Sequence, residues 1–156
     1  MSAVPPQKLT TFWAFEKDAE EAVTFYTSVF EDSEVLHTIR ARADEPGWTE
    51  GTLQHAIFSL GGQQFMCINI PPAGARGHDH APWDTYRFSG ATATYVQCSS
   101  DSEFDRLFAA LSEKGEVVMP VGSYGFSAKF ALVEDRFGMS WRLNLSAPTS
   151  AGRSSS

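Results

Sequence analysis

The hydrophobic positions of this chain change their spacing in a fixed order, and the same order occurs twice. In the first half, residues 8–16 read as a strand, and apolar side chains then recur every three or four residues between Ala19 and Phe30. That spacing predicts a helix with one apolar face. Three further strands are expected at residues 34–41, 52–60 and 63–70. The first half is therefore predicted to run strand, helix, strand, strand, strand.

The second half repeats this order. A strand at residues 91–98 precedes a helix that is expected to end near Gly115. The buried face of this helix is marked by Phe104, Leu107, Phe108 and Leu111. The remaining strands are expected at residues 116–120, 126–133 and 139–145. The sequence thus predicts an α+β fold built from two βαβββ modules.

Short polar and glycine motifs mark the ends of these elements. Asp18 followed by Glu21, and Ser100 followed by Glu103, match the capping box of a helix start. The Gly61–Gly62 pair predicts a two-residue hairpin between the third and fourth strands, because glycine tolerates positive φ. Both helix starts and one hairpin can therefore be placed from the sequence.

The modules also define the expected domain organisation. The chain is divided into an N-terminal arm (1–7), a first module (8–70), a connector rich in Pro and Gly (71–90), a second module (91–145) and a tail (146–156). The closing strands contain Ile-Asn-Ile and Leu-Asn-Leu, which coincide when the two halves are overlaid. This overlay makes Asn69 and Asn144 equivalent positions.

Composition restricts the possible partners. The 156 residues are 42% hydrophobic and 13% aromatic, which favours a filled core or an aromatic pocket. A net charge of -7 argues against nucleic-acid binding, which requires clustered Lys and Arg. No apolar run is long enough to span a membrane, and the N-terminus lacks the features of a signal peptide. We therefore expect a cytoplasmic protein with Cys67 and Cys98 reduced, although a disulfide between them stays possible.

The motifs of several large enzyme classes are missing. No Gly-x-Gly-x-x-Gly follows a predicted strand, and the chain contains no Walker loop, Gly-x-Ser-x-Gly or Cys-x-x-Cys. Dinucleotide binding and S-adenosylmethionine binding of the Rossmann type are therefore not expected.

Four segments carry a resemblance to a known family. They are residues 19–26, His55-Ala56-Ile57-Phe58 with Gly61–Gly62, Tyr124-Gly125-Phe126 and Asp135-Arg136-Phe137-Gly138-Met139-Ser140-Trp141. Over about residues 8–145 the chain resembles the vicinal oxygen chelate superfamily, which includes glyoxalase I and the fosfomycin and bleomycin resistance proteins. Within it, the chain is similar to the PhnB-like group, which carries the label 3-demethylubiquinone-9 3-methyltransferase. The resemblance implies paired half-barrel sheets around a cavity, and a homodimer.

In metalloenzymes of that superfamily, the ligands come from the first and last strand of each module and are mostly His, Gln and Glu. By resemblance, the corresponding positions here are Thr11, Cys67, the strand start at residues 91–93 and Arg142. This set does not suit a divalent metal, because an Arg repels a cation and the Ala residues offer no donor. We therefore predict no metal in the usual place and no other cofactor.

Alternation along the strands predicts which side chains face the cavity. Met66 and Ile68 are expected under the first helix, and Trp141 and Leu143 under the second. The cavity side is then expected to carry Thr11, Trp13, Phe15, His55, Ile57, Ser59, Phe65, Cys67, Asn69, Ser140, Arg142 and Asn144.

Two residues are the catalytic candidates. Arg142 would hold a carboxylate, phosphonate or enolate through two parallel hydrogen bonds, unless it pairs with a local carboxylate or points outward at a dimer edge. His55 would act as acid or base, unless it is a strand histidine that braces a loop. Cys67 would be a nucleophile if Arg142 lowered its pKa, the alternative being a small buried thiol.

Seven residues are predicted to bind the substrate: Trp13, Phe15, Phe65, Cys67, Asn69, Tyr124 and Asn144. The aromatic members suit either a planar ligand or a packed core, and Tyr124 suits either a cover over the cavity mouth or simple packing. His78 and His80 form a His-x-His pair in the connector, where a solvated loop is favoured over a metal site because no further ligand is near in sequence.

Three functions follow from these expectations. The first is a metal-independent enzyme, lyase- or isomerase-like, that acts on a small anionic or carbonyl-containing molecule through Arg142 and His55. The second is a non-catalytic module that binds or sequesters a small aromatic molecule. The third, ranked last, is a metal enzyme with atypical ligands. Methyltransferase activity is not expected, because nothing in the chain resembles a methyl-donor fold.

Overall fold

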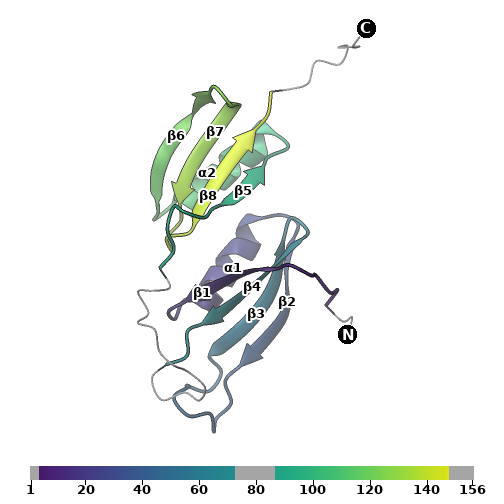
Figure 1. Cartoon of the computed structure of the whole chain (residues 1–156), viewed down its shortest axis with the longest axis vertical. Helices are drawn as coiled ribbons and strands as arrows, with labels where there is room; N and C mark the ends of the chain where they lie inside the picture. The colour runs from purple at the N-terminus through teal and green to yellow at the C-terminus, as the bar shows by residue number, and fades with distance from the viewer. Residues whose placement is uncertain (1–3, 73–86, 148–156) are drawn as a thin grey trace. The chain divides into compact units, whose positions relative to one another are not determined.

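The computed structural model describes residues 4–72 and 87–147, which divide into two compact units. Unit 1 (Met1–Arg87) contains β1 (Thr11–Phe15), α1 (Ala19–Val29), β2 (Ser33–Arg40), β3 (Leu53–Leu60) and β4 (Gln63–Asn69). Unit 2 (Phe88–Ser156) contains β5 (Thr94–Gln97), α2 (Asp101–Ser112), β6 (Glu116–Tyr124), β7 (Ser127–Glu134) and β8 (Ser140–Leu145). The predicted βαβββ order is confirmed in both units (Figure 1).

Each unit builds one four-stranded mixed sheet with the same topology. The strand orders are β1-β4-β3-β2 and β5-β8-β7-β6. The first strand of each unit runs parallel to the last, and the other neighbours are antiparallel. A parallel first strand requires a crossover, and in each unit the helix supplies it on one face of the sheet. We call this face the helix face and the opposite one the open face.

The largest difference from the predicted boundaries is in β6. The sequence places this strand at residues 116–120, whereas the structure continues it to Tyr124. Pro120 lies inside it, and the register with β7 shifts three times. A proline is tolerated here because β6 is an edge strand of its sheet, so the missing N–H removes no ladder bond.

The two helix starts are stabilised in different ways. Ser100 caps α2 as predicted: its hydroxyl accepts from the Glu103 N–H at 3.1 Å. The equivalent prediction for Asp18 is wrong, because its side chain makes no capping hydrogen bond. The first N–H of α1, from Ala19, instead donates to the side-chain oxygen of Asn69 at 2.9 Å. This cap comes from β4, fifty residues later in the chain, so the local sequence around α1 cannot reveal it.

The Gly61–Gly62 turn joins β3 and β4 as predicted. Both glycines have positive φ, 58° and 82°, which matches the type of two-residue turn that suits the twist of a hairpin.

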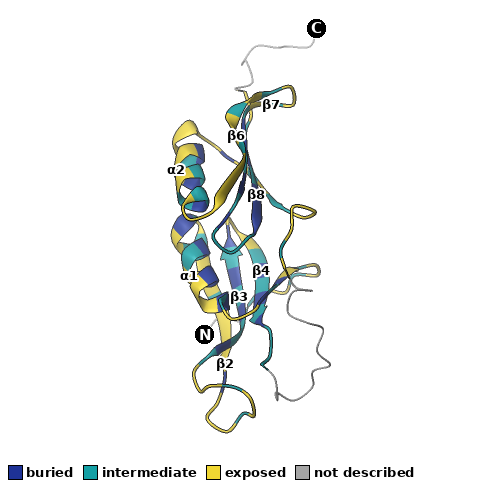
Figure 2. Ribbon diagram, turned by 90° about the vertical axis from the view of Figure 1, so that its left-hand side faces the viewer, coloured by how far each residue is buried: buried dark blue, intermediate teal, exposed yellow. Residues whose placement is uncertain are grey.

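The cores lie between each helix and its own sheet. In unit 1, Trp13 packs on Tyr26 of α1 with ring centroids 5.6 Å apart, and on Phe65 at 4.8 Å. In unit 2, Trp141 and Leu143 are fully buried, as are Phe104 and Leu111 of α2. Figure 2 shows the buried positions of each helix on the side that faces its sheet. Within the described residues, no helix combines the length and the apolar composition needed to cross a membrane.

Candidate functional site

In β1 and β4 of unit 1, the side chains face the opposite side of the sheet from the one predicted. Trp13, Phe15, Phe65, Cys67 and Asn69 are all at most 6% exposed and lie on the helix face. The predicted placement of these five residues toward a cavity is therefore wrong. They form the core beneath α1. The prediction that they bind a ligand depended on their facing a cavity, and this placement does not support it.

The physical reason is the phase of the alternation. Both registers of β4 offer an apolar set, since Met66 and Ile68 are as hydrophobic as Phe65 and Cys67. The larger aromatic residue is buried, and Met66 and Ile68 fall on the open face with intermediate exposure. In β3 the prediction is confirmed: Ala56 and Phe58 are fully buried, and His55 lies on the open face opposite Ile68.

The internal repeat is offset by one residue from the Ile-Asn-Ile and Leu-Asn-Leu overlay. Cys67 pairs with Ala56 across the sheet, and Leu143 pairs with Ala131 in the same way. The structural equivalent of Arg142 is therefore Met66 and not Cys67. Asn69 and Asn144 are likewise not equivalent, since Asn69 lies on the helix face and Asn144 lies on the open face.

His55 lies on the open face of unit 1, beside Ile39 of β2 and Ile68 of β4. Its Nδ1 atom is buried without a hydrogen-bond partner among the described residues. Burial lowers the pKa of His55 below its ordinary value, and the nearby His37 lowers it further. The neutral imidazole is therefore favoured, which suits a proton acceptor.

Neither cysteine is suited to act as a nucleophile. Burial raises the pKa of Cys67 to about 12 and that of Cys98 to about 11, and both thiols are free. Arg142 is not among the groups that shift the Cys67 pKa. This is the opposite of the lowered pKa that the nucleophile hypothesis required.

We expect both thiols to be protected in the folded protein. At pH 8 a thiol-specific reagent should modify Cys67 and Cys98 at least about a hundredfold more slowly in buffer than in 6–8 M urea, because only the exposed thiolate reacts. Absorbance after mixing with a chromogenic disulfide measures this rate. Rapid modification of either thiol without denaturant would contradict the raised pKa values.

Arg142 lies near the middle of the open face of unit 2. It is placed on β8 between Tyr95 of β5 and Leu132 of β7, and its side chain is half-buried. No described residue forms a hydrogen bond or an ion pair with its guanidinium group. The prediction that Arg142 faces away from the helix agrees with this placement, and the alternative of a local carboxylate partner finds no support among the described residues.

An aromatic cluster covers one end of this face. Phe130 is 2% exposed and packs edge-on against Phe126 at 4.9 Å and Tyr124 at 5.9 Å. Tyr124 also stacks on Phe126, and its hydroxyl donates to the Pro120 carbonyl at 2.8 Å. Phe126 remains 70% exposed, so the cluster presents a flat aromatic surface.

Asn144 joins the aromatic cluster to Arg142. It lies opposite Phe130 and two residues along β8 from Arg142, on the same face. Its amide nitrogen donates to Gln97 at 2.9 Å, and its oxygen accepts from the Ser127 hydroxyl. The open face of unit 2 thus places a polar amide between the aromatic cluster and the Arg142 guanidinium.

The positions that hold a metal in related folds do not fit one here. Thr11 and Cys67 lie on the same face of the sheet as the α1 core, whereas Met66 and Arg142 occupy the equivalent open-face positions. A thioether and a guanidinium do not ligate a hard divalent ion. Within residues 4–72 and 87–147, no three His, Cys, Asp or Glu side chains are grouped to hold a metal ion. His78 and His80 lie outside the described residues.

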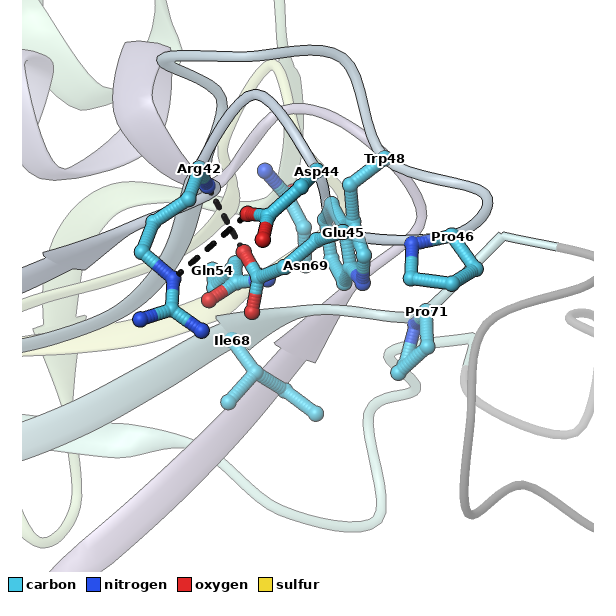
Figure 3. Close-up of a pocket in the computed structure, with 9 residues that line it drawn as sticks. All are labelled: Arg42, Asp44, Glu45, Pro46, Trp48, Gln54, Ile68, Asn69 and Pro71. Atoms are coloured by element: carbon cyan, nitrogen blue, oxygen red, sulfur yellow. Dashed lines mark hydrogen bonds and ion pairs between the residues drawn. The ribbon is translucent and has the colours of Figure 1, made fainter.

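A pocket of about 550 Å³ lies in unit 1, beside the long β2–β3 loop. Figure 3 shows the side chains that line it, including Arg42, Asp44, Glu45, Trp48 and Gln54. This pocket was not predicted from the sequence. The one available signal was a tryptophan within a loop that also contains Pro46-Gly47, because a loop at the surface usually lacks large aromatic residues.

Comparisons with known proteins agree with the fold. Residues 7–144 match the family model described as 3-demethylubiquinone-9 3-methyltransferase. A search of curated proteins found no match. Among solved structures, the PhnB protein from Bacillus cereus is 43% identical over 90% of this chain and 100% of its own, with a TM-score of 0.75.

More distant structures share the fold alone. PA1353 from Pseudomonas aeruginosa is 24% identical over 90% of this chain and 98% of its own, with a TM-score of 0.73. The fosfomycin resistance protein FosX from Listeria monocytogenes is 11% identical over 92% of this chain and 96% of its own, with a TM-score of 0.57. The chain therefore belongs to the PhnB-like family described as 3-demethylubiquinone-9 3-methyltransferase.

Proposed function

We propose that this protein binds a small anionic molecule on the open face of unit 2, with Arg142 as the anchor. The observation that carries the proposal is the position of Arg142, a residue of intermediate exposure on the open face whose guanidinium forms no hydrogen bond or ion pair with any described residue. Partial withdrawal of a charge from water carries a cost when no protein group compensates for it. A bound carboxylate or phosphonate would offset this cost through two parallel hydrogen bonds.

The neighbours of Arg142 favour one orientation of the ligand. Glu134 lies on the same face, opposite Ser140, on one side of Arg142. Asn144 and the aromatic cluster lie on the other side. Because a carboxylate repels an anion, the body of the ligand is expected to extend toward Phe130 and Phe126. A flat aromatic or apolar part beside the anionic group fits this surface.

Binding is supported better than conversion. The two residues predicted to act together, Arg142 and His55, belong to different units, and each is placed only within its own sheet. The side chains nearest to Arg142 in register are Tyr95 and Leu132. A metal-independent lyase or isomerase would need a proton acceptor at the ligand, and the two direct neighbours of Arg142, Tyr95 and Leu132, offer neither a carboxylate nor an imidazole. The alternative to an enzyme is a non-catalytic module that sequesters a small molecule, by analogy with the resistance proteins that the chain resembles.

The proposal predicts charge-selective binding that depends on Arg142. In ligand-observed NMR titrations, phenylphosphonate and benzoate should bind better than neutral benzyl alcohol. The Arg142→Gln substitution should weaken phenylphosphonate binding at least about tenfold, which is the loss of roughly one charge-assisted hydrogen bond.

Arg106→Gln provides the matched control, because it removes the same charge from an exposed position of α2 in the same unit. This variant should bind like the unaltered protein. Equal affinity for the three probes, or an equal loss in both variants, would overturn the proposal. Probe signals that stay unchanged over hours support binding alone, whereas new product signals would establish an enzyme.

A further inference from the structure

We propose that the pocket beside the β2–β3 loop is a second binding site, specific for a small organic cation with a flat apolar part. An arylalkylammonium ion is the simplest member of this class. The site lies wholly in unit 1, so it is separate from the Arg142 surface of unit 2 and does not depend on the function proposed there.

The size of the pocket suits a small molecule. Its volume of about 550 Å³ lies within the range of about 300–1,000 Å³ that is usual for ligand sites. The walls come from the loop between β2 and β3, from the start of β3, and from the end of β4 with the residues that follow it. Ile68 joins the pocket to the open face, because it lies directly opposite His55 in the sheet.

The charges that line the pocket favour a cation. Two carboxylates, Asp44 and Glu45, stand against one guanidinium, Arg42. Arg42 Nε is 4.0 Å from Asp44 Oδ1, and both side chains are more than three-quarters exposed. Such an exposed, long ion pair is worth little. The pocket therefore keeps a net negative charge, and Arg42 does not neutralise Glu45 through a direct side-chain contact.

Glu45 is held in place before any ligand binds. Its Oε2 atom accepts from the Arg42 backbone N–H at 2.7 Å and from Gln54 Nε2 at 3.1 Å (Figure 3). The loop backbone also folds back on itself, since the Trp48 N–H donates to the Glu45 carbonyl at 3.2 Å. A fixed carboxylate loses little conformational entropy on binding, which favours affinity for an ammonium group.

The remaining lining is apolar and flat. Trp48 is half-buried, and Pro46 and Pro71 lie together at the end of the pocket away from Arg42, as Figure 3 shows. An indole ring is the strongest of the aromatic partners for a cation, and it also stacks with a flat apolar group. A carboxylate and a tryptophan in one pocket thus supply the two contacts that an aromatic amine requires.

The test uses three probes of the same size and different charge: phenethylammonium, 2-phenylethanol and phenylacetate. In ligand-observed NMR titrations of the full chain, phenethylammonium should bind at least about fivefold better than the alcohol, and phenylacetate should bind worst at this site. Glu45→Gln should reduce phenethylammonium affinity about tenfold or more, and Trp48→Ala should remove detectable binding.

Glu50→Gln is the matched control, because Glu50 is exposed in the same loop and does not line the pocket. It should leave phenethylammonium binding unchanged, and so should Arg142→Gln in unit 2. Far-UV circular dichroism and melting temperatures check that the variants are folded. Equal binding of the cation and the alcohol, or equal losses in Glu45→Gln and Glu50→Gln, would overturn the proposal.

Discussion

Replacing Asp135 with alanine is expected to destabilise unit 2 by about 3–5 kcal/mol, which is at the upper end of single-residue effects. The Asp135 carboxylate is buried and accepts three hydrogen bonds: from Trp141 Nε1 at 2.8 Å, from the Phe137 N–H at 2.8 Å and from the Met139 N–H at 3.1 Å. Alanine would leave these donors without that acceptor, two of them in the interior.

The experiment is urea unfolding followed by far-UV circular dichroism. Asp135→Asn should lose less stability than Asp135→Ala, because the amide oxygen can still accept some of these hydrogen bonds. It should nevertheless be less stable than the unaltered protein, because the amide NH2 group then faces an N–H donor. Asp32→Ala removes an exposed carboxylate in unit 1 and should change stability by no more than about 0.5 kcal/mol. A loss below about 1 kcal/mol in Asp135→Ala would contradict the structural role assigned to this carboxylate.

This result would also explain the most specific segment of the family resemblance, Asp135–Trp141. The segment forms a tight turn in which the Gly138 N–H donates to the Asp135 carbonyl and Gly138 has a φ of 87°. Trp141 then closes the turn from β8. The motif therefore specifies a turn and the position of a core tryptophan.

The second large effect is expected at Asn69. Asn69→Ala should destabilise unit 1 by about 2–4 kcal/mol, because the amide caps α1 through the Ala19 N–H and donates to the Leu53 carbonyl at 2.8 Å. Both bonds are buried, so water cannot replace them easily. Asn69 thus ties the start of α1 to both β3 and β4.

Asn144→Ala is the natural comparison, because the sequence overlay makes the two asparagines equivalent. Its partners include the side chains of Gln97 and Ser127, which are not fully buried and can bond to water instead. A loss of about 1 kcal/mol or less is expected. Urea unfolding of the two variants in parallel measures both losses in the free energy of unfolding. Equal losses would contradict the larger stabilising role assigned to Asn69.

The two proposed sites would give the chain opposite charge preferences in its two units. Arg142 offers a cation that no described residue pairs with on a sheet face, and Glu45 offers a fixed anion in a loop pocket. The duplicated fold therefore does not imply duplicated chemistry. The side chains at the equivalent positions Met66 and Arg142 differ in chemistry, and a fold alone does not specify a function.

The order of the helices and strands could be predicted from the residues alone. Helix and strand periods, the Ser100 cap and the Gly61–Gly62 turn are local signals, and each of them was found where it was expected. The family resemblance could also be predicted, because it depends on short, local segments of sequence. The open-face position of His55 and Arg142 was also readable, since alternation in β3 and β8 offers one clearly more hydrophobic side.

The remaining features depend on contacts between elements that lie far apart in the chain. In β4 both faces are apolar, so the choice between Phe65 and Met66 depended on the space left by Trp13 and Tyr26. The cap of α1 comes from Asn69 and not from Asp18, because a buried amide brought by β4 meets the helix start. The pocket around Glu45 likewise needs the loop, β3 and the end of β4 to come together. Contacts between residues distant in the chain have no local signature, and they determined which side chains became core and which became surface.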